Sequence, residues 1–171
     1  MAVTTTETKV QLPQGSLVGR QRDGVQAFCG VPYALPPVLA RRWQPPSPVV
    51  ASDTIIDARL FGPMAPQLSE TGLALAETSE DCLNLNIWTP DQARGAPVMV
   101  WLHGGGFCSG SNRVRGSVFA KEGVVLVAPN YRLGMLGFVA HPLVESQTAN
   151  FGLLDLILAL QWVKDLYLIH N

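Results

Sequence analysis

The stretch PVMVWLHGGGF, residues 97–107, places three consecutive glycines directly after an apolar run. The run Val98–Leu102 is typical of a buried strand, and glycines weaken such an element unless the backbone must turn sharply. On a sharp turn, bare N–H groups can be aimed at an oxygen that becomes negatively charged, which is what an oxyanion hole requires in acyl transfer. The alternative is a glycine-rich turn without a ligand. The motif alone leaves both interpretations open.

A catalytic site of this kind also needs a nucleophile, commonly a serine in a Gly-x-Ser-x-Gly turn between a strand and a helix. No such pentad occurs between Met1 and Asn171, and the serines of Gly106–Ser111 stand at the wrong offset from the glycines. Cys108 is not expected to replace that serine, because no histidine or basic residue near it in the sequence would favour a thiolate. We therefore expect part of an active site in a chain that stops before its nucleophile.

Composition predicts one largely buried, nearly neutral domain. The chain has 171 residues, of which 47% are apolar and 15% charged. The net charge of −1, without a long run of like charges, argues against a nucleic-acid or anionic-membrane partner. No segment has the apolar length of a membrane span, because Asp155 interrupts Leu153–Leu160.

The cysteine count and the first residues bear on the compartment. Cys29, Cys82 and Cys108 are an odd number, and Met1–Glu7 lacks the basic and apolar parts of a secretory signal. We therefore expect free thiols rather than a disulfide framework, and a cytoplasmic protein.

Hydrophobic patterning predicts a β-rich first part. Strands are expected over residues 8–12, 17–22, 25–29, 54–57 and 83–88. The last of these alternates apolar and polar residues, which predicts one buried face. A brief helical turn is expected within residues 71–77.

The later part predicts α/β structure. Residues 98–102 and 123–128 are continuously apolar, as in parallel strands covered on both faces, and residues 114–122 form the crossover between them. A helix is expected over residues 151–164 with Asn150 as its N-cap, and it is apolar nearly all round, as in a helix inside a larger protein.

Several motifs occur in a fixed order along the chain. They are Phe28–Ala34, Arg42-Trp43, Phe61–Pro63, Ser79–Pro90, His103–Phe107, Asn130–Gly134 with Gly137-Phe138, and Asn150–Asp155. Together they resemble the type-B carboxylesterase and cholinesterase family of the α/β-hydrolase fold, from about Val10 to Val163. The most specific are EDCLNLNIW before the glycines and NYRLG after them.

The resemblance implies an α/β fold, the N-terminal part of a mostly parallel central sheet preceded by an antiparallel β section. Residues 1–171 would be an N-terminal fragment of a single α/β-hydrolase domain, truncated before the nucleophile elbow. In this family Gly105 and Gly106 would donate N–H groups to the oxyanion of a serine carboxylic-ester hydrolase. A third donor, the serine, the acid and the histidine would lie beyond Asn171. Gly104 and Phe107 would border a small-molecule ester; no cofactor, metal or particular oligomeric state is implied.

Other polar residues are assigned structural roles. Asp155 lies in an otherwise apolar helix and needs a cation, for which Arg132 is the candidate, and the resemblance supports the pair. The same argument pairs Glu80 with Arg42. None of His103, His141 and His170 matches the position of the family's catalytic histidine, and His103 is expected to be structural.

Two departures from the family pattern stand out. A Gly-Pro-x-Cys-Pro stretch that usually supplies a disulfide partner in eukaryotic members is GPMAP at residues 62–66, so Cys82 lacks that partner. This favours a cytoplasmic, bacterial-type esterase. The likeness also fails from Lys164 onward, as expected for a truncated or frame-shifted product.

Two other classes compete with an esterase of this family. A non-catalytic, cholinesterase-like adhesion or binding module is opposed by the intact glycines 104–106 and the absence of a signal sequence. A hormone-sensitive-lipase-like esterase also has a His-Gly-Gly-Gly loop, but the long β-rich first part and the Glu80–Trp88 motif do not fit that branch.

Overall fold

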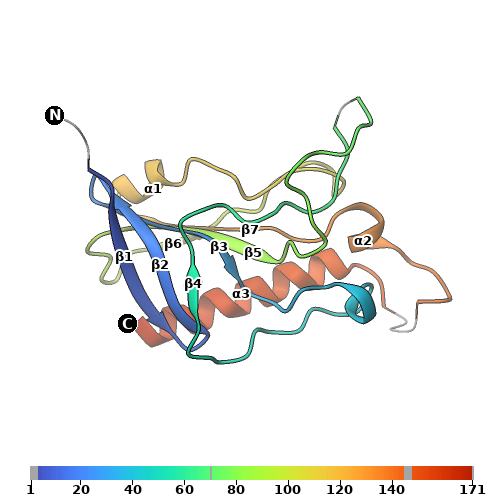
Figure 1. The fold of residues 1–171 in the computed structure, drawn as a ribbon, viewed down its shortest axis with the longest axis horizontal. Coiled ribbons are helices and arrows are strands. Elements are labelled where there is room, and N and C mark those ends of the chain that lie inside the picture. The colour runs from blue at the N-terminus through green and yellow to red at the C-terminus, as the bar shows by residue number, and fades with distance from the viewer. Residues whose placement is uncertain (1–3, 70, 145–147, 171) are drawn as a thin grey trace.

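A mixed β-sheet runs through the computed structural model, which describes residues 4–69, 71–144 and 148–170 (Figure 1). Its seven strands follow the order β1-β2-β3-β5-β7-β6, and β4 pairs with β2 outside this path. The strands are β1 (Thr6–Leu12), β2 (Gly15–Arg22), β3 (Val25–Pro32), β4 (Ile55–Asp57), β5 (Asn84–Pro90), β6 (Val98–Val100) and β7 (Val125–Pro129). The seven strand predictions are confirmed, with ends that shift by up to a few residues.

The strand directions divide the sheet. The neighbours from β1 through β2, β3 and β5 to β7 pair antiparallel, whereas β6 pairs parallel with β7, and β4 pairs parallel with β2. The two continuously apolar strands are therefore parallel, as predicted. The prediction that both strands are covered on both faces is wrong for β6. In the described ranges β6 is an edge strand of the sheet, and its Val98 and Met99 are exposed.

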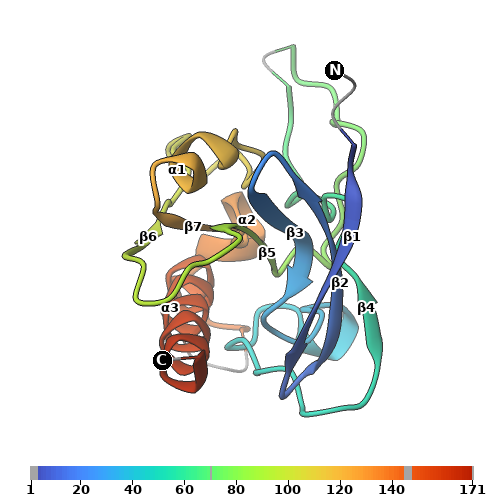
Figure 2. The same cartoon turned by 90° about the vertical axis from the view of Figure 1, so that its left-hand side faces the viewer.

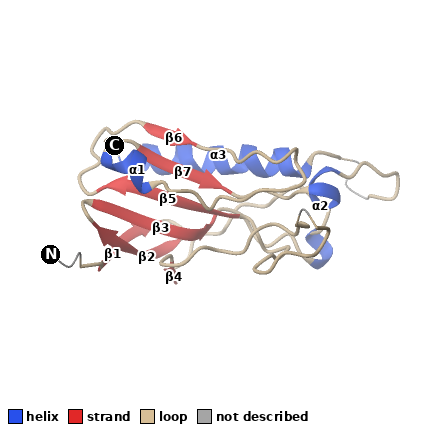
Figure 3. Cartoon of the chain, turned by 90° about the horizontal axis from the view of Figure 1, so that it is seen from above, coloured by secondary structure: helices blue, strands red, loops and turns tan. Residues whose placement is uncertain are grey.

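Helices lie on both faces of the sheet (Figure 2). The short α1 (Ser117–Lys121) covers one face over β5, β3 and β7, and α3 (Phe151–His170) lies against the opposite face. Figure 3 shows α3 extending in the direction of β6 and β7. The remaining helices are α2 (Gly134–Phe138), which packs against α3, and a 3-10 turn over Leu39–Arg41.

The predicted helix is present but longer than expected, since it continues past Lys164 to His170. It starts on the main-chain carbonyl of Asn150, which accepts the N–H groups of Leu153 at 2.9 Å and Leu154 at 3.1 Å. In the described ranges, no helix has both the length and the apolar character needed to cross a membrane. The helical turn predicted within residues 71–77 is wrong: Leu68 and Ala74 form an isolated β-bridge there.

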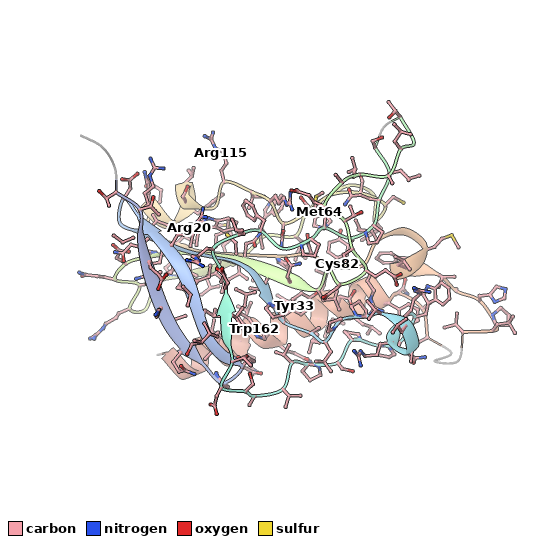
Figure 4. The ribbon with its side chains drawn as sticks, in the orientation of Figure 1. Arg20, Tyr33, Met64, Cys82, Arg115 and Trp162 are labelled. Carbon is pink, nitrogen blue, oxygen red and sulfur yellow. The ribbon has the colours of Figure 1, made fainter. Side chains whose placement is uncertain are left out.

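Two apolar cores form because successive strand residues point to opposite faces. Leu85 and Ile87 of β5 join the larger core, which also contains Trp162 of α3 (Figure 4). Trp88 joins the smaller core, together with Ala120 of α1. The prediction that β5 has only one buried face is therefore wrong. The polar Asn84 and Asn86 are also buried, and their amides are hydrogen-bonded.

The outer face of α3 carries a stripe of exposed apolar side chains. Leu153, Ile157 and Leu160 are 52%, 45% and 47% exposed, and they follow one another at helical spacing. Leu156, on the neighbouring face of the helix, is buried in the larger core. An uncovered stripe of this kind favours self-association.

Charging this stripe is expected to reduce self-association of the 171-residue chain. Leu153→Glu, Ile157→Lys and Leu160→Glu together should lower the fluorescence of a dye that binds apolar surfaces and leave helical circular dichroism unchanged. The control Leu156→Glu places a carboxylate in the core and should abolish the helical signal. Unchanged dye binding in the triple variant would contradict the assignment of this stripe as the surface that favours self-association.

Candidate functional site

The glycines of the opening motif lie in a loop between β6 and α1, here called the glycine loop (His103–Gly110). The carbonyl of Gly105 accepts the N–H groups of Cys108 and Ser109, each at 3.1 Å, so the loop contains a tight turn. Gly105 and Gly106 have φ of +118° and +59°, a region that residues with a Cβ rarely adopt. The turn thus explains why glycine stands at both positions.

The N–H groups of Gly105 and Gly106 are free donors. Both residues are exposed, and neither N–H has an acceptor in the described part of the chain. Successive main-chain N–H groups on a turn form a concave site suited to an anion. Gly104, which precedes them, is also exposed, but its backbone does not require glycine and its carbonyl accepts the Nδ1–H of His103 at 3.0 Å.

Phe107 follows the two donors in a strained backbone conformation, with φ of +62°. Its carbonyl accepts the N–H of Gly134 at 2.7 Å, and its ring lies 4.9 Å from the ring of Phe138. Phe107 is nevertheless 58% exposed. An aromatic surface therefore lies beside the free N–H groups.

His103 supports the loop from inside the protein. Its ring is buried and stacks on Tyr131 with centroids 4.4 Å apart, and the Tyr131 hydroxyl donates to the His103 carbonyl at 3.0 Å. Burial lowers the pKa of His103, although its hydrogen bond to the Gly104 carbonyl opposes that effect. His141 is exposed and its Nδ1 accepts the N–H of Leu143; the His170 side chain lies outside the described residues.

The three cysteines are free. Burial raises the pKa of Cys29 to about 11 and also raises the pKa of Cys82, so both remain thiols at neutral pH. Cys108 is exposed on the glycine loop. In the described ranges no group of histidine, cysteine, aspartate and glutamate side chains is arranged to hold a metal ion.

A network of buried asparagines connects the segment after the glycine loop to the sheet. This network is not predicted from the sequence. Asn112 donates to Asn84 Oδ1 at 3.0 Å and accepts, through its carbonyl, the amide of Asn86 at 2.9 Å. Its N–H donates to Asn130 Oδ1 at 2.8 Å. The available signal was polar residues at strand positions otherwise surrounded by apolar ones.

The structure brings Arg132 and Asp155 together in a buried pair. The Arg132 main-chain N–H and Nε donate to Asp155 Oδ2 at 3.0 and 2.8 Å, and Nη2 donates to Oδ1 at 2.6 Å. Arg132 Nη1 donates to the Gln44 carbonyl at 2.9 Å. Burial raises the pKa of the Asp155 carboxyl, and the contacts with Arg132 oppose that rise. The pair ties the end of β7 to the start of α3.

Arg42 and Glu80 also meet, through two hydrogen bonds of 2.5 and 2.6 Å. This pair is partly exposed, at 39% and 28% of the two side chains. Both ion pairs are thus structural contacts rather than parts of the free N–H site.

A mixed sheet with helices on both faces and a glycine loop after β6 defines the class: the protein has the α/β-hydrolase fold. Residues 6–166 match the Carboxylesterase family, and the chain belongs to that family. The resemblance to type-B carboxylesterases noted from the sequence is therefore confirmed.

Individual relatives agree with this assignment. The chain is similar to the fumonisin B1 esterase of Sphingopyxis macrogoltabida, with 44% identity over 163 residues, 88% of this chain and 30% of that protein. It is 38% identical over 170 residues to the para-nitrobenzyl esterase of Bacillus subtilis, covering 94% and 35%. A solved PNB esterase structure matches with a TM-score of 0.83 at 38% identity, covering 92% and 34%. The chain thus spans about one third of the length of these relatives.

Breaking the buried ion pair is expected to destabilise the protein strongly. Asp155→Asn leaves the Arg132 charge buried without its counter-charge, and removing one partner of such a pair typically costs about 3–5 kcal/mol. Urea unfolding followed by tryptophan fluorescence measures the change in unfolding free energy. Glu80→Gln is the control and should have a much smaller effect because water screens the partly exposed pair. Equal losses in the two variants would contradict the difference in burial.

The lowered pKa of His103 predicts a specific pH dependence. Above about pH 6.5, the ordinary histidine pKa, the ring is neutral in both the folded and the unfolded states. As the pH falls below that value, the unfolded state binds a proton first, so the unfolding free energy decreases. His103→Gln should flatten this decrease, whereas His141→Gln at the exposed site should preserve it. An unaltered slope in His103→Gln would contradict the assignment.

Proposed function

We propose that this chain supplies the oxyanion hole of a serine carboxylic-ester hydrolase, with the N–H groups of Gly105 and Gly106 as donors. The observation that carries the proposal is the pair of adjacent, exposed and unpartnered N–H groups on a loop of a carboxylesterase-family chain. Donors held in place before the reaction stabilise the charge that develops on the substrate's carbonyl oxygen. Gly104 and the exposed ring of Phe107 border the ester.

In the proposed reaction, groups from outside these 171 residues complete the site. A serine oxygen attacks the ester carbonyl carbon while a histidine takes the serine proton, and the carbonyl electrons move onto the oxygen facing Gly105 and Gly106. The tetrahedral intermediate collapses, the alcohol leaves with that proton, and water then hydrolyses the acyl-enzyme. We assign the serine, acid and histidine to the two thirds of an esterase domain that the chain does not span. The protein is proposed to act in the cytoplasm on a small-molecule ester without a cofactor.

The central experiment compares the 171-residue chain with a fusion protein. The fusion joins residues 1–166 to the remaining part of the Bacillus subtilis para-nitrobenzyl esterase, in place of that enzyme's own matching region. With a p-nitrophenyl ester, the 171-residue chain is expected to show no hydrolysis above a buffer blank, and the fusion should be active. Turnover by the 171-residue chain that Cys108→Ala or Ser109→Ala abolishes would instead reveal a nucleophile within it. A folded but inactive fusion would favour a non-catalytic binding role.

Within the active fusion, Gly106→Ala is expected to reduce kcat sharply. A Cβ meets no neighbour at this position, so the effect arises from the left-handed backbone, which alanine would rotate together with the N–H. Loss of one oxyanion donor lowers kcat by about 10²–10³-fold, or roughly 3 kcal/mol.

Gly123→Ala is the matched control for backbone strain. Gly123 also has a positive φ, +81°, and open space at its Cβ position, but it lies in the turn between α1 and β7. The two variants should lose similar stability, while only Gly106→Ala loses activity. A kcat within a factor of a few of wild type for Gly106→Ala would refute the oxyanion assignment.

A further inference from the structure

Gln67 contacts both main-chain polar groups of Gly110, the last residue of the glycine loop. Its side-chain Nε2 donates to the Gly110 carbonyl at 2.9 Å, and its Oε1 accepts the Gly110 N–H at 2.8 Å. Nε2 also donates to the Ala65 carbonyl at 3.1 Å. One amide side chain thus joins the glycine loop to the segment between β4 and β5, and these three hydrogen bonds all go to main-chain atoms.

Gly110 in turn closes the glycine loop. A Cβ at this position would overlap Nδ1 of His103 and the carbonyl oxygen of Gly104, so its main chain lies against the beginning of the loop. The preceding residue, Ser109, is equally close to Gly105: a Cβ on Gly105 would overlap the Ser109 carbonyl. A displacement of Gly110 therefore passes directly to the residues that carry the free N–H groups.

The beginning and middle of the loop have their own anchors. The Tyr131 hydroxyl holds the His103 carbonyl, and the Gly134 N–H holds the Phe107 carbonyl. Both anchors come from the segment after β7. Gln67 approaches from another part of the chain and holds the end of the loop, where it also lines an open cavity beside Cys108 and Ser109.

We infer that Gln67 is a positioning residue for the oxyanion hole: by fixing Gly110 it sets the direction of the Gly105 and Gly106 N–H groups. The inference rests on the proposed function of those groups. The role is one of positioning, because the hydrogen bonds of the Gln67 side chain go to Gly110 and Ala65. Its removal should weaken transition-state binding more than substrate binding, because the donors act on the charge that develops during the reaction.

The test uses the active fusion protein described above and three variants. Gln67→Met keeps the length of the side chain and removes its hydrogen bonds to Gly110. It should lower kcat by about tenfold to a hundredfold while KM stays within about twofold. Gln21→Met is the control, since it removes an exposed amide's hydrogen bond to Asp91 in the antiparallel part of the sheet and should leave kcat unchanged.

Gln67→Glu provides a second readout that a merely structural role would not produce. A carboxylate can accept the Gly110 N–H but cannot donate to the Gly110 carbonyl, whereas a protonated carboxyl group can do both. The ratio of the variant's kcat to that of the wild-type fusion should therefore rise severalfold as the pH falls from about 8 towards 5, through the titration of the new carboxyl group.

The outcomes separate the inference from the function on which it rests. A Gly106→Ala variant that loses activity, beside a Gln67→Met variant that keeps it, would refute the positioning role and leave the oxyanion hole intact. Equal loss of kcat and gain in KM for Gln67→Met, with a pH-independent ratio for Gln67→Glu, would also overturn it. If Gln67→Met fails to fold, a flat pH ratio for Gln67→Glu alone would still refute the inference. The proposed function itself would be refuted by a fusion protein that is inactive, or by one whose kcat is unchanged by Gly106→Ala.

Discussion

The buried contact between Arg132 and Asp155 holds the segment on which the candidate site depends. Three hydrogen bonds fasten Arg132 to the first turns of α3, so the chain leaving β7 has a fixed position. The neighbouring Tyr131 holds the start of the glycine loop, and Gly134 holds its middle. This ion pair does not contact the free N–H groups, but it thus fixes the position of Tyr131 and Gly134, which hold the loop that carries them. Because both charges are out of water, neither partner is dispensable while the other remains.

Buried amides complement this charge pair. Asn112, just after the glycine loop, is bonded to Asn84 on β5 and to Asn130 at the end of β7. Amide groups suit such a position because each one donates and accepts, and can therefore satisfy irregular main-chain groups where a regular ladder has ended. Gln67 does the same at Gly110. The glycine loop presents free N–H donors, whereas the amides of the residues around it use their donors to fix the main chain.

The sequence predicted what depends on local pattern. Apolar runs and alternation located the strands, three glycines located the loop, and a carboxylate in an apolar helix required Arg132. It could not predict contacts that depend on tertiary folding. The alternation in β5 predicts one buried and one solvent-exposed face. The fold instead buries Asn86 beneath the segment that contains Asn112. Likewise β6 has the composition of a covered strand, whereas its exposure depends on which elements lie beside it. The residues around Gln67 form no pattern that predicts its hydrogen bonds to Gly110, 43 positions away.

The arrangement also explains why a third of an esterase-length chain can hold a formed glycine loop. The loop's anchors, Tyr131, Gly134 and Gln67, all belong to the same 171 residues, as do the asparagines behind it. Its geometry is therefore set by contacts within this chain rather than by the part that would carry a nucleophile. Oxyanion stabilisation depends on donors that need no reorganisation when charge develops, which requires a backbone fixed in advance. Hydrogen bonds from Tyr131, Gly134 and Gln67 around two unpartnered N–H groups meet that requirement.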